Sequence, residues 1–103
     1  METLENLHFD RTGFLNDPAQ WNEAIAEEIA RQDEVGPLTP THWQIIRYLR
    51  ESWINRHALP SMSHTCHLVG RDPACMEALF HGPREAWRIA GLPDPGEEAR
   101  AYM

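Results

Sequence analysis

The sequence contains no lysine and only two cysteines among its 103 residues. All nine basic side chains are arginines, and 16 acidic side chains outnumber them, so the net charge is −7. A net negative chain opposes broad attraction to nucleic acids, because neutralising phosphates needs clustered cations. We therefore expect no general nucleic-acid binding, although a local arginine patch stays open.

Long apolar runs and a leader segment are also missing. No stretch approaches the ~20 consecutive apolar residues that a membrane-spanning helix needs. The opening METLENLHFD lacks the basic and apolar regions of a secretory signal. We expect a cytoplasmic protein without membrane contact. In such a chain the two cysteines are expected as free thiols rather than as a disulfide.

What the chain does have is enough apolar material for one core, with 42% hydrophobic residues and four tryptophans. That content fits one small domain, which we place over residues 1–95. The tryptophans recur at helical spacing and are expected to pack in it. Residues 96–103 form a polar, acidic tail whose composition is typical of a disordered segment. We expect a monomer.

Local patterns predict a mainly α fold. Residues 6–15, NLHFDRTGFL, flank a polar DRTG with apolar residues and predict a small N-terminal β-hairpin. A first helix begins at Asp17-Pro18 and ends at Gly36, because Asp is a good N-cap and Pro suits the first turn. A second begins at Thr39-Pro40 and stops before Pro60.

Three shorter helices follow, predicted over residues 61–70, 72–80 and 82–91 from a capping residue or proline at the start and a break after each. The expected architecture is a compact bundle of about five short helices with a small N-terminal β-hairpin. An extended C-terminal arm then follows, stiffened by the prolines of GLPDP.

The segment HTCH resembles a metal-ligand cluster, since thiolates and imidazoles bind zinc or copper, and Cys75 and His81 follow nearby. On a helix, however, Cys66 lies about 200° around the axis from His64. His64 and His67 are neighbours at a spacing of three, but two imidazoles make an incomplete site. We expect a core cysteine beside two solvated histidines, and no metal or cofactor.

Cys75 has two interpretations. It falls in the first turn of the helix over 72–80, where unpaired N–H groups favour a reactive thiolate. Alternatively, it is a small apolar residue packed beneath Leu79. No Ser-His-Asp arrangement can be assigned from spacing, and the chain has no Gly-rich phosphate loop. Enzyme activity is therefore not predicted from these residues.

The helices over 61–70 and 72–80 have the outline of a helix-turn-helix. The second would read DNA with PACMEALF, whose single charge is negative, so it lacks the Arg, Lys, Asn or Gln that reach base edges. A DNA-binding regulator would need instead a basic face, which would be thin, built from Arg47, Arg50, Arg56, Arg71 and Arg84.

Three longer motifs occur in a familiar order: GFLNDPAQWNEAIAEEIA, LTPTHWQIIRYLRESW and LFHGPREAWRIAGLPDP. Together they span roughly residues 10–95, and the chain resembles the DsrC/TusE family. This family includes the gamma subunit of dissimilatory sulfite reductase and the sulfur-relay protein of tRNA 2-thiouridine synthesis. The resemblance implies a helical domain whose C-terminal arm carries a cysteine at its tip. That thiol takes up sulfur and inserts into a partner enzyme.

This chain departs from the family pattern at the arm. Glu98 stands where the resemblance places the tip cysteine, counting from RIAGLPDP, and the next-to-last residue is Tyr102. Trp87 occupies the place of a second cysteine and is expected to pin the arm against the body. Neither a carboxylate nor a phenol can form a persulfide. The family's carrier role therefore passes to no arm residue.

The resemblance then leaves two functions open. The favoured one is protein–protein binding or regulation in a sulfur-relay or sulfite-reductase system, with an arm that contacts the partner through Arg88, Leu92, Pro93, Pro95 and Tyr102. The alternative is a sulfur carrier or sulfurtransferase component that uses Cys75 or Cys66.

Overall fold

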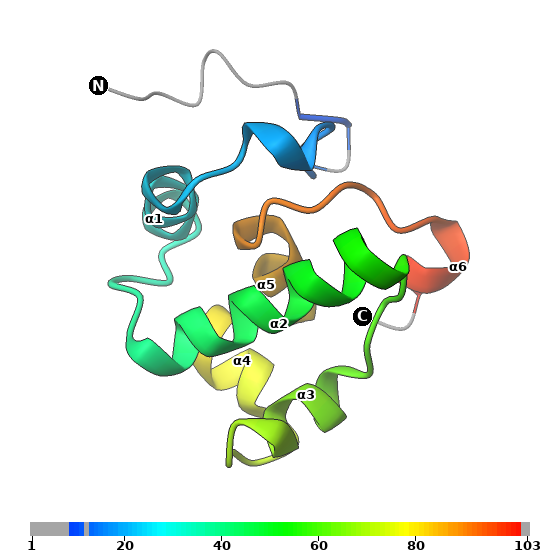
Figure 1. The fold of residues 1–103 in the computed structure, drawn as a ribbon. Helices are drawn as coiled ribbons and strands as arrows, with labels where there is room; N and C mark the ends of the chain where they lie inside the picture. The colour runs from blue at the N-terminus through cyan, green and yellow to red at the C-terminus, as the bar shows by residue number, and fades with distance from the viewer. Residues whose placement is uncertain (1–8, 12, 102–103) are drawn as a thin grey trace.

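The computed structural model describes residues 9–11 and 13–101 of the chain (Figure 1). Within them the chain forms a short 3-10 helix, Pro18–Gln20, and six α-helices. These are α1 (Glu23–Gln32), α2 (Pro40–Arg56), α3 (Met62–Leu68), α4 (Cys75–Phe80), α5 (Pro83–Ile89) and α6 (Glu97–Arg100). None of the helices in this described part is both long and apolar enough to cross a membrane.

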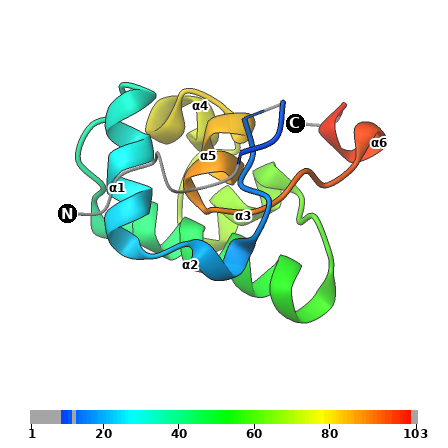
Figure 2. The ribbon, with the colours of Figure 1, turned by 90° about the horizontal axis from the view of Figure 1, so that it is seen from above.

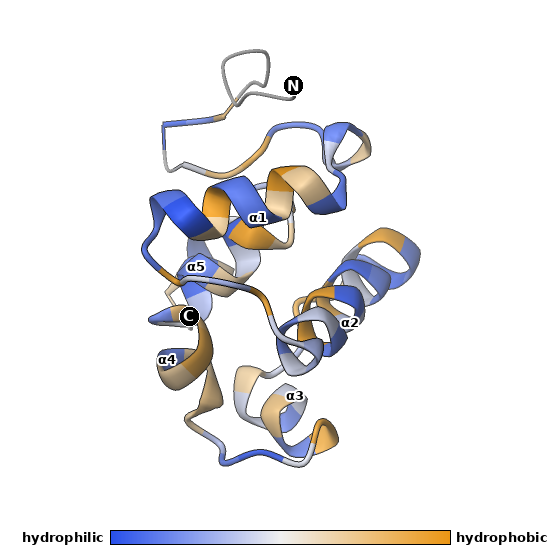
Figure 3. Ribbon diagram, turned by 90° about the vertical axis from the view of Figure 1, so that its left-hand side faces the viewer, coloured by the Kyte–Doolittle hydropathy of each residue, from blue (hydrophilic) through white to orange (hydrophobic). Residues whose placement is uncertain are grey.

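Helix α5 lies at the centre of the molecule, and α1, α2 and α4 pack against it (Figure 1). Its Trp87 and Ile89 are fully buried. Helix α3 lies at one end, against α2 and α4. Apolar and polar residues share α1 and α2, as an amphipathic helix on a core requires (Figure 3). The mainly α fold is thus confirmed.

The predicted β-hairpin is wrong. Phe9 and Leu15 form one isolated antiparallel bridge, and residues 9–11 and 13–101 contain no strand. The carboxylate of Asp10 accepts the Phe14 N–H at 3.1 Å, and the Asp10 N–H donates to the Phe14 carbonyl at 2.8 Å. These contacts close a short loop that brings Phe9 opposite Leu15, the one pair that the described residues form here. Residues 6–8 of the prediction lie outside the described residues.

The first helix starts later than predicted. Asp17 does cap a turn at Pro18, but this turn is the 3-10 helix, which ends at extended Trp21. Asn22 then caps α1 and accepts the Ile25 N–H at 2.9 Å. The second start is confirmed, because Thr39 caps α2 with Pro40 in its first turn. Two good caps in succession made the first start ambiguous in the sequence.

The later helices follow the predicted starts with small shifts. Ser61 caps α3, as expected. Helix α4 begins at Cys75 rather than Pro73, because the Asp72 carboxylate accepts the Ala74 N–H and closes a turn first. Helix α6, a single turn in the polar tail, was not predicted. The division into a domain over 1–95 and a tail over 96–103 stays a prediction.

Candidate functional site: the C-terminal arm and its groove

The arm, residues 92–101, leaves the body at the C-terminal end of α5 and runs across the molecule to α6 (Figure 2). The last carbonyls of a helix have no partner within it and must be satisfied from outside. The Trp21 indole N–H donates to the Ile89 carbonyl at 2.9 Å, and Arg50 Nη1 donates to the Ala90 carbonyl at 2.8 Å. These two side chains fix the point where the arm begins.

Arg50 joins three segments at this point. Its Nη2 donates to the Pro18 carbonyl at 3.2 Å, and its guanidinium lies 4.1 Å from the centre of a Trp21 ring. Burial lowers the pKa of Arg50, yet an arginine so placed stays charged at neutral pH. The cation therefore cross-links the 3-10 helix, α2 and the base of the arm.

Gly91 makes the turn into the arm. Its φ is +70°, a left-handed conformation that favours glycine. A Cβ at this position would also overlap the Trp21 side chain. Because both the backbone and the space require glycine, the direction in which the arm departs is fixed.

Trp87 holds the first part of the arm. Its indole N–H donates to the Pro93 carbonyl at 2.8 Å, and its side chain is fully buried. The Trp53 ring packs edge-on against it, with centroids 5.5 Å apart. The hypothesis that Trp87 pins the arm to the body is supported by this hydrogen bond.

The far part of the arm folds on itself. Asp94 Oδ1 accepts the Gly96 N–H at 2.9 Å and lies 3.3 Å from Arg100 Nε. These contacts close the turn that leads into α6. The arm is therefore extended at Pro93 and Pro95 and helical at its end.

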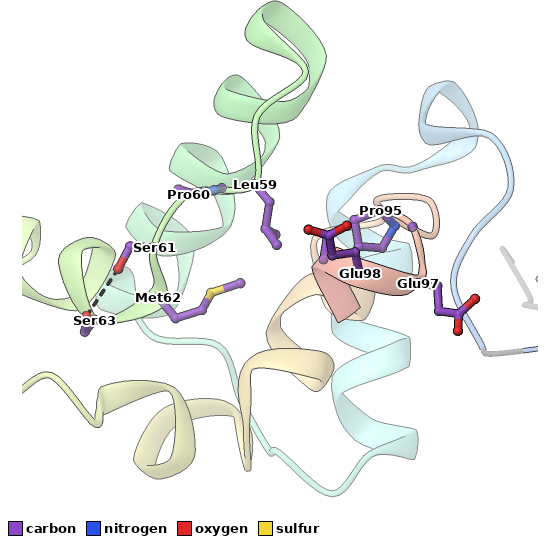
Figure 4. A pocket seen from close by; sticks show the side chains of 10 residues that line it. Leu59, Pro60, Ser61, Met62, Ser63, Pro95, Glu97 and Glu98 are labelled. Carbon is purple, nitrogen blue, oxygen red and sulfur yellow. Dashed lines mark hydrogen bonds between the residues drawn. The ribbon is translucent and has the colours of Figure 1, made fainter. Parts of the chain in front are cut away.

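A groove of about 810 Å³ lies between α6 and the segment that leads into α3. One wall comes from the arm, residues 95–99, and the other from residues 59–63. In Figure 4 the side chains of Leu59 and Met62 extend toward the arm. The Glu98 carboxylate lies on the groove side of Pro95, so Glu98, the residue predicted to stand in place of a tip cysteine, lines this groove.

The other predicted arm residues are placed differently. Arg88 belongs to the body: its Nη1 lies 3.0 and 2.9 Å from the two Asp33 carboxylate oxygens, and its Nε donates to the Gly13 carbonyl at 2.9 Å. Leu92 is fully buried. Pro93 and Pro95 are half-buried. Tyr102 lies outside the described residues, and the binding role of the set stays a prediction.

The two cysteines are joined, so the expectation of free thiols is wrong. Cys66 on α3 and Cys75 on α4 form a disulfide, with their Cα atoms 5.7 Å apart. The cause is tertiary: the reversal at Gly70, whose φ is +75°, brings two short helices side by side. Cys75 is 4% exposed and Cys66 is fully buried, which confirms the core position expected for Cys66.

The histidines of HTCH stack on each other, with ring centroids 6.4 Å apart. Within residues 9–11 and 13–101 no group of three or more His, Cys, Asp or Glu side chains could hold a metal ion.

The arginines of the postulated basic face are dispersed among other contacts. Arg47 pairs with Glu23 at 3.4 Å and Arg56 with Glu51 at 3.0 Å, while Arg50 is turned toward α5. Arg71 donates to the Thr41 hydroxyl at 3.3 Å, and Arg84 lies over Phe14. Neutralised or inward-facing cations contribute little to phosphate binding.

Sequence reasoning missed His42, which is 5% exposed. Its Nδ1 lies 3.0 Å from the Thr39 N–H, completing a capping box, and its Nε2 lies 2.7 Å from the Leu79 carbonyl. It joins α2 to α4. The signal available was its position at the third residue after the Thr39 cap, where Glu or Gln is usual.

The chain resembles known proteins over most of its length. A family model described as DsrC like protein matches residues 3–97. The chain belongs to this DsrC-like family. The resemblance expected from its motifs is thus confirmed.

Sequence relatives of this DsrC-like chain include the sulfurtransferase TusE of Photorhabdus laumondii. It is 31% identical over 100 residues, which cover 88% of this chain and 89% of the relative. TusE of Escherichia coli K12 is 27% identical, covering 88% of this chain and 91% of the relative. The similarity therefore spans nearly the whole of each protein.

Solved structures agree. The oxidized gamma-subunit of the dissimilatory sulfite reductase (DsrC) from Archaeoglobus fulgidus is 34% identical, with a TM-score of 0.77 over 88% of this chain and 90% of that one. A chain of dissimilatory sulfite reductase I (DsrI) is 25% identical, with a TM-score of 0.78 over 88% and 89%.

Proposed function

We propose that this protein acts in a sulfur-relay or sulfite-reductase system by binding a protein partner, without carrying sulfur on its arm. Membership of the DsrC-like family supports the setting, since relatives are named as a sulfurtransferase and as a subunit of dissimilatory sulfite reductase. The partner is a protein of such a system.

One observation carries the proposal. The arm reaches the groove with a carboxylate, that of Glu98, at the position that the resemblance assigns to the carrier cysteine. Residues 92–101 contain no thiol. Sulfur transfer through a persulfide needs a sulfur nucleophile. The arm therefore lacks the atom that the transfer implied by the resemblance would need.

The geometry favours binding by this arm. Proline at 93 and 95 restricts the backbone, and the Trp87 hydrogen bond holds the arm before any partner arrives. Ordering that is already present in the free protein lowers the entropic cost of association. Leu59 and Met62 add apolar surface beside Glu98, so a partner can contact both walls of the groove.

The alternative carrier, Cys75, is less well placed. It is nearly buried and bonded to Cys66, and a sulfur in a disulfide is not a thiolate nucleophile. It also lies on α4, away from the arm (Figure 1). Delivery into a partner's active site would require both bond breakage and a rearrangement of the body.

Sulfur loading provides the first experiment. The protein, its Glu98→Cys variant and a TusE relative with a cysteine tip are incubated with sodium polysulfide, and intact mass is measured. Peptide mapping then locates any added sulfur, and we expect it on the arm of the relative and of Glu98→Cys, with none on residues 92–101 of the unmodified protein. A gain by the unmodified protein that disappears in Cys75→Ser would instead establish the carrier function.

Partner binding provides the second experiment. Purified dissimilatory sulfite reductase is titrated with this protein by calorimetry. Met62→Asp, in the groove, should weaken binding about tenfold or more, since a charge buried at an interface is costly. Leu68→Asp, on the same helix but 52% exposed, is the matched control and should bind normally. Equal loss in both variants, or no binding of the unmodified protein, would contradict the proposal.

A further inference from the structure

The disulfide between Cys66 and Cys75 has no part in the function proposed above. It joins α3 to α4 across a sequence separation of nine residues. The connecting residues 70–74 are all exposed. A covalent link therefore lies in the core directly behind a solvent-exposed loop.

Helix α3 depends on this link more than its neighbours do. Its only buried residues are Thr65 and Cys66. The Thr65 hydroxyl donates to the Ser61 carbonyl at 2.8 Å, within the same segment, so this hydrogen bond does not join α3 to another helix. Met62 and Val69 are partly buried against the core. Cys66 is thus the one residue of α3 that is fully buried and bonded to another helix.

The same helix forms part of the groove. Residues 59–63, which lead into α3 and include its first turn, make the wall opposite Glu98 (Figure 4). Ser61 caps α3 and lines the groove, so movement of α3 moves this wall. The disulfide and the groove are therefore connected through one short helix.

We propose that Cys66–Cys75 is a reversible redox site for dithiol reductants and that its reduction loosens α3 and the groove wall that α3 carries. The redox site itself stands on the disulfide alone. Only its regulatory meaning rests on the proposed function, because that function places the partner at the groove.

The reaction is a two-electron thiol–disulfide exchange. A thiolate of the dithiol attacks Sγ of Cys75, the more exposed of the two residues; a mixed disulfide forms and Cys66 leaves as a thiolate that takes up a proton. The second thiolate of the reductant then attacks the reductant sulfur that is bonded to Cys75. The Cys75 thiolate leaves and is protonated. The reductant becomes a disulfide, and the reverse exchange restores the original bond.

The fold around the site suits both states. Access requires local opening of residues 70–74, a short exposed loop of the kind that opens without global unfolding. After reduction each thiol stays in the core as a small, weakly polar group. Helices α1, α2 and α5 keep their own buried residues, so the change is confined to α3 and its flanks.

The test is hydrogen exchange by mass spectrometry on the full chain, before and after treatment with dithiothreitol under native conditions. We expect intact mass to show two added hydrogens. Amides of residues 59–69 should then exchange on the order of tenfold to a hundredfold faster, from the loss of a short closed loop. Peptides from α1 and α5 should not change. Oxidised dithiothreitol should restore the slow exchange.

The variant Cys66→Ala/Cys75→Ala serves as the control, and its exchange should be fast and indifferent to dithiothreitol. If that variant does not fold, reduced protein capped with iodoacetamide replaces it. Resistance of the disulfide to dithiothreitol unless denaturant is added would overturn the redox site. So would thiols that remain unpaired after oxidation, or reduction without faster exchange in α3.

Binding then separates this inference from the proposed function. Oxidised and reduced protein are each titrated into dissimilatory sulfite reductase, and we expect affinities that differ at least threefold. Equal affinity in both states would overturn the regulatory role. Absence of binding in both states would contradict the proposed function, while the exchange result would still decide the redox site.

Discussion

The arm and helix α3 form opposite walls of one groove but are attached to the body in different ways. The arm is held by the hydrogen bond from Trp87 to Pro93 and by buried Leu92, and Arg50 fixes its base at the Ala90 carbonyl. Helix α3 is held by a covalent bond between Cys66 and Cys75. The two attachments respond to different agents.

A hydrogen bond contributes about 1 kcal/mol net and can be exchanged for one to a partner at little cost. A disulfide breaks only when a nucleophile such as a thiolate attacks one sulfur and the pair is reduced. The arm is thus held in place before docking by contacts that a partner can replace, whereas the α3 wall keeps its position until the redox state changes. One groove can in this way combine a pre-ordered wall with a switchable one.

The largest expected effect comes from a change at the base of the arm, where the arm leaves the body. Gly91→Ala combines a Cβ that overlaps Trp21 with a left-handed backbone, so we expect a loss of about 4 kcal/mol in unfolding free energy. Chemical denaturation measures it. Gly96→Ala is the control: its φ is +112°, but no atom lies within 4 Å of the added Cβ. Equal losses would show that only backbone strain matters.

The covalent attachment is tested next. Reduction of the disulfide, or Cys66→Ala/Cys75→Ala, should lower the unfolding free energy by about 2.5 kcal/mol, because a closed loop of this length no longer restricts the unfolded chain. Denaturation of the unmodified protein with and without dithiothreitol gives the value. The double variant should be unaffected by dithiothreitol. A reduced protein as stable as the oxidised one would remove the contrast between the two walls.

A substitution of Arg50 tests how much its contacts at the base of the arm contribute to stability. Arg50→Met removes charged hydrogen bonds to the Ala90 and Pro18 carbonyls while keeping the aliphatic stem, so we expect a loss of about 2 kcal/mol. The matched control is Arg47→Met on the same helix, whose pair with Glu23 is exposed and contributes little. Similar unfolding midpoints for the two variants would contradict the role assigned to Arg50.

A smaller effect is expected from Trp87→Phe, which changes how the arm is attached. Trp87→Phe removes the donor to the Pro93 carbonyl and should cost about 1 kcal/mol. It should also increase fast backbone motion over residues 93–101, measured by nuclear relaxation. Trp53→Phe keeps the hydrogen bond and should leave the arm's motion unchanged. Fast motion of the arm in the unmodified protein would mean that Trp87 does not pin it.

A surface pair on α1 gives the smallest effect and a baseline. Arg31 hydrogen-bonds Glu28 and lowers the pKa of that carboxyl below its ordinary value. A lowered folded-state pKa gives stability above the unfolded-state pKa that is lost as pH falls through the folded value. Arg31→Gln should raise the Glu28 pKa toward normal, measured by nuclear magnetic resonance titration, with little change in stability. Arg47→Gln should leave it unchanged.

Much of the fold followed from local signals. Thr39-Pro40 and Ser61 placed the starts of α2 and α3 correctly, because caps act over a single helical turn. The hairpin prediction failed at a loop that the Asp10 side chain and backbone close with hydrogen bonds to Phe14. Helix α6 was missed because a single turn stabilised by the Asp94–Arg100 pair has almost no periodicity to read.

Some features of the candidate site could also be predicted from the residues, and others could not. The absence of a thiol from the arm follows directly from the residues, since neither Glu98 nor any other residue from 92 to 101 is a cysteine. The role of Trp87 was predicted from its position and is supported by its contact with Pro93. The disulfide was not predicted, because a chain without a secretory signal was expected to keep free thiols. That expectation was wrong, because the separation of Cys66 and Cys75 depends on how two helices pack.

By itself, then, the sequence determined the helical class, most helix starts, the family resemblance and the absence of a thiol from the arm. These depend on residue type and short-range spacing. Only the tertiary structure decided that Cys66 meets Cys75, that Arg50 and Trp21 hold the base of the arm, and that Glu98 faces a groove with Leu59 and Met62. Such contacts join residues far apart in the chain, and their geometry exists only once the core has packed.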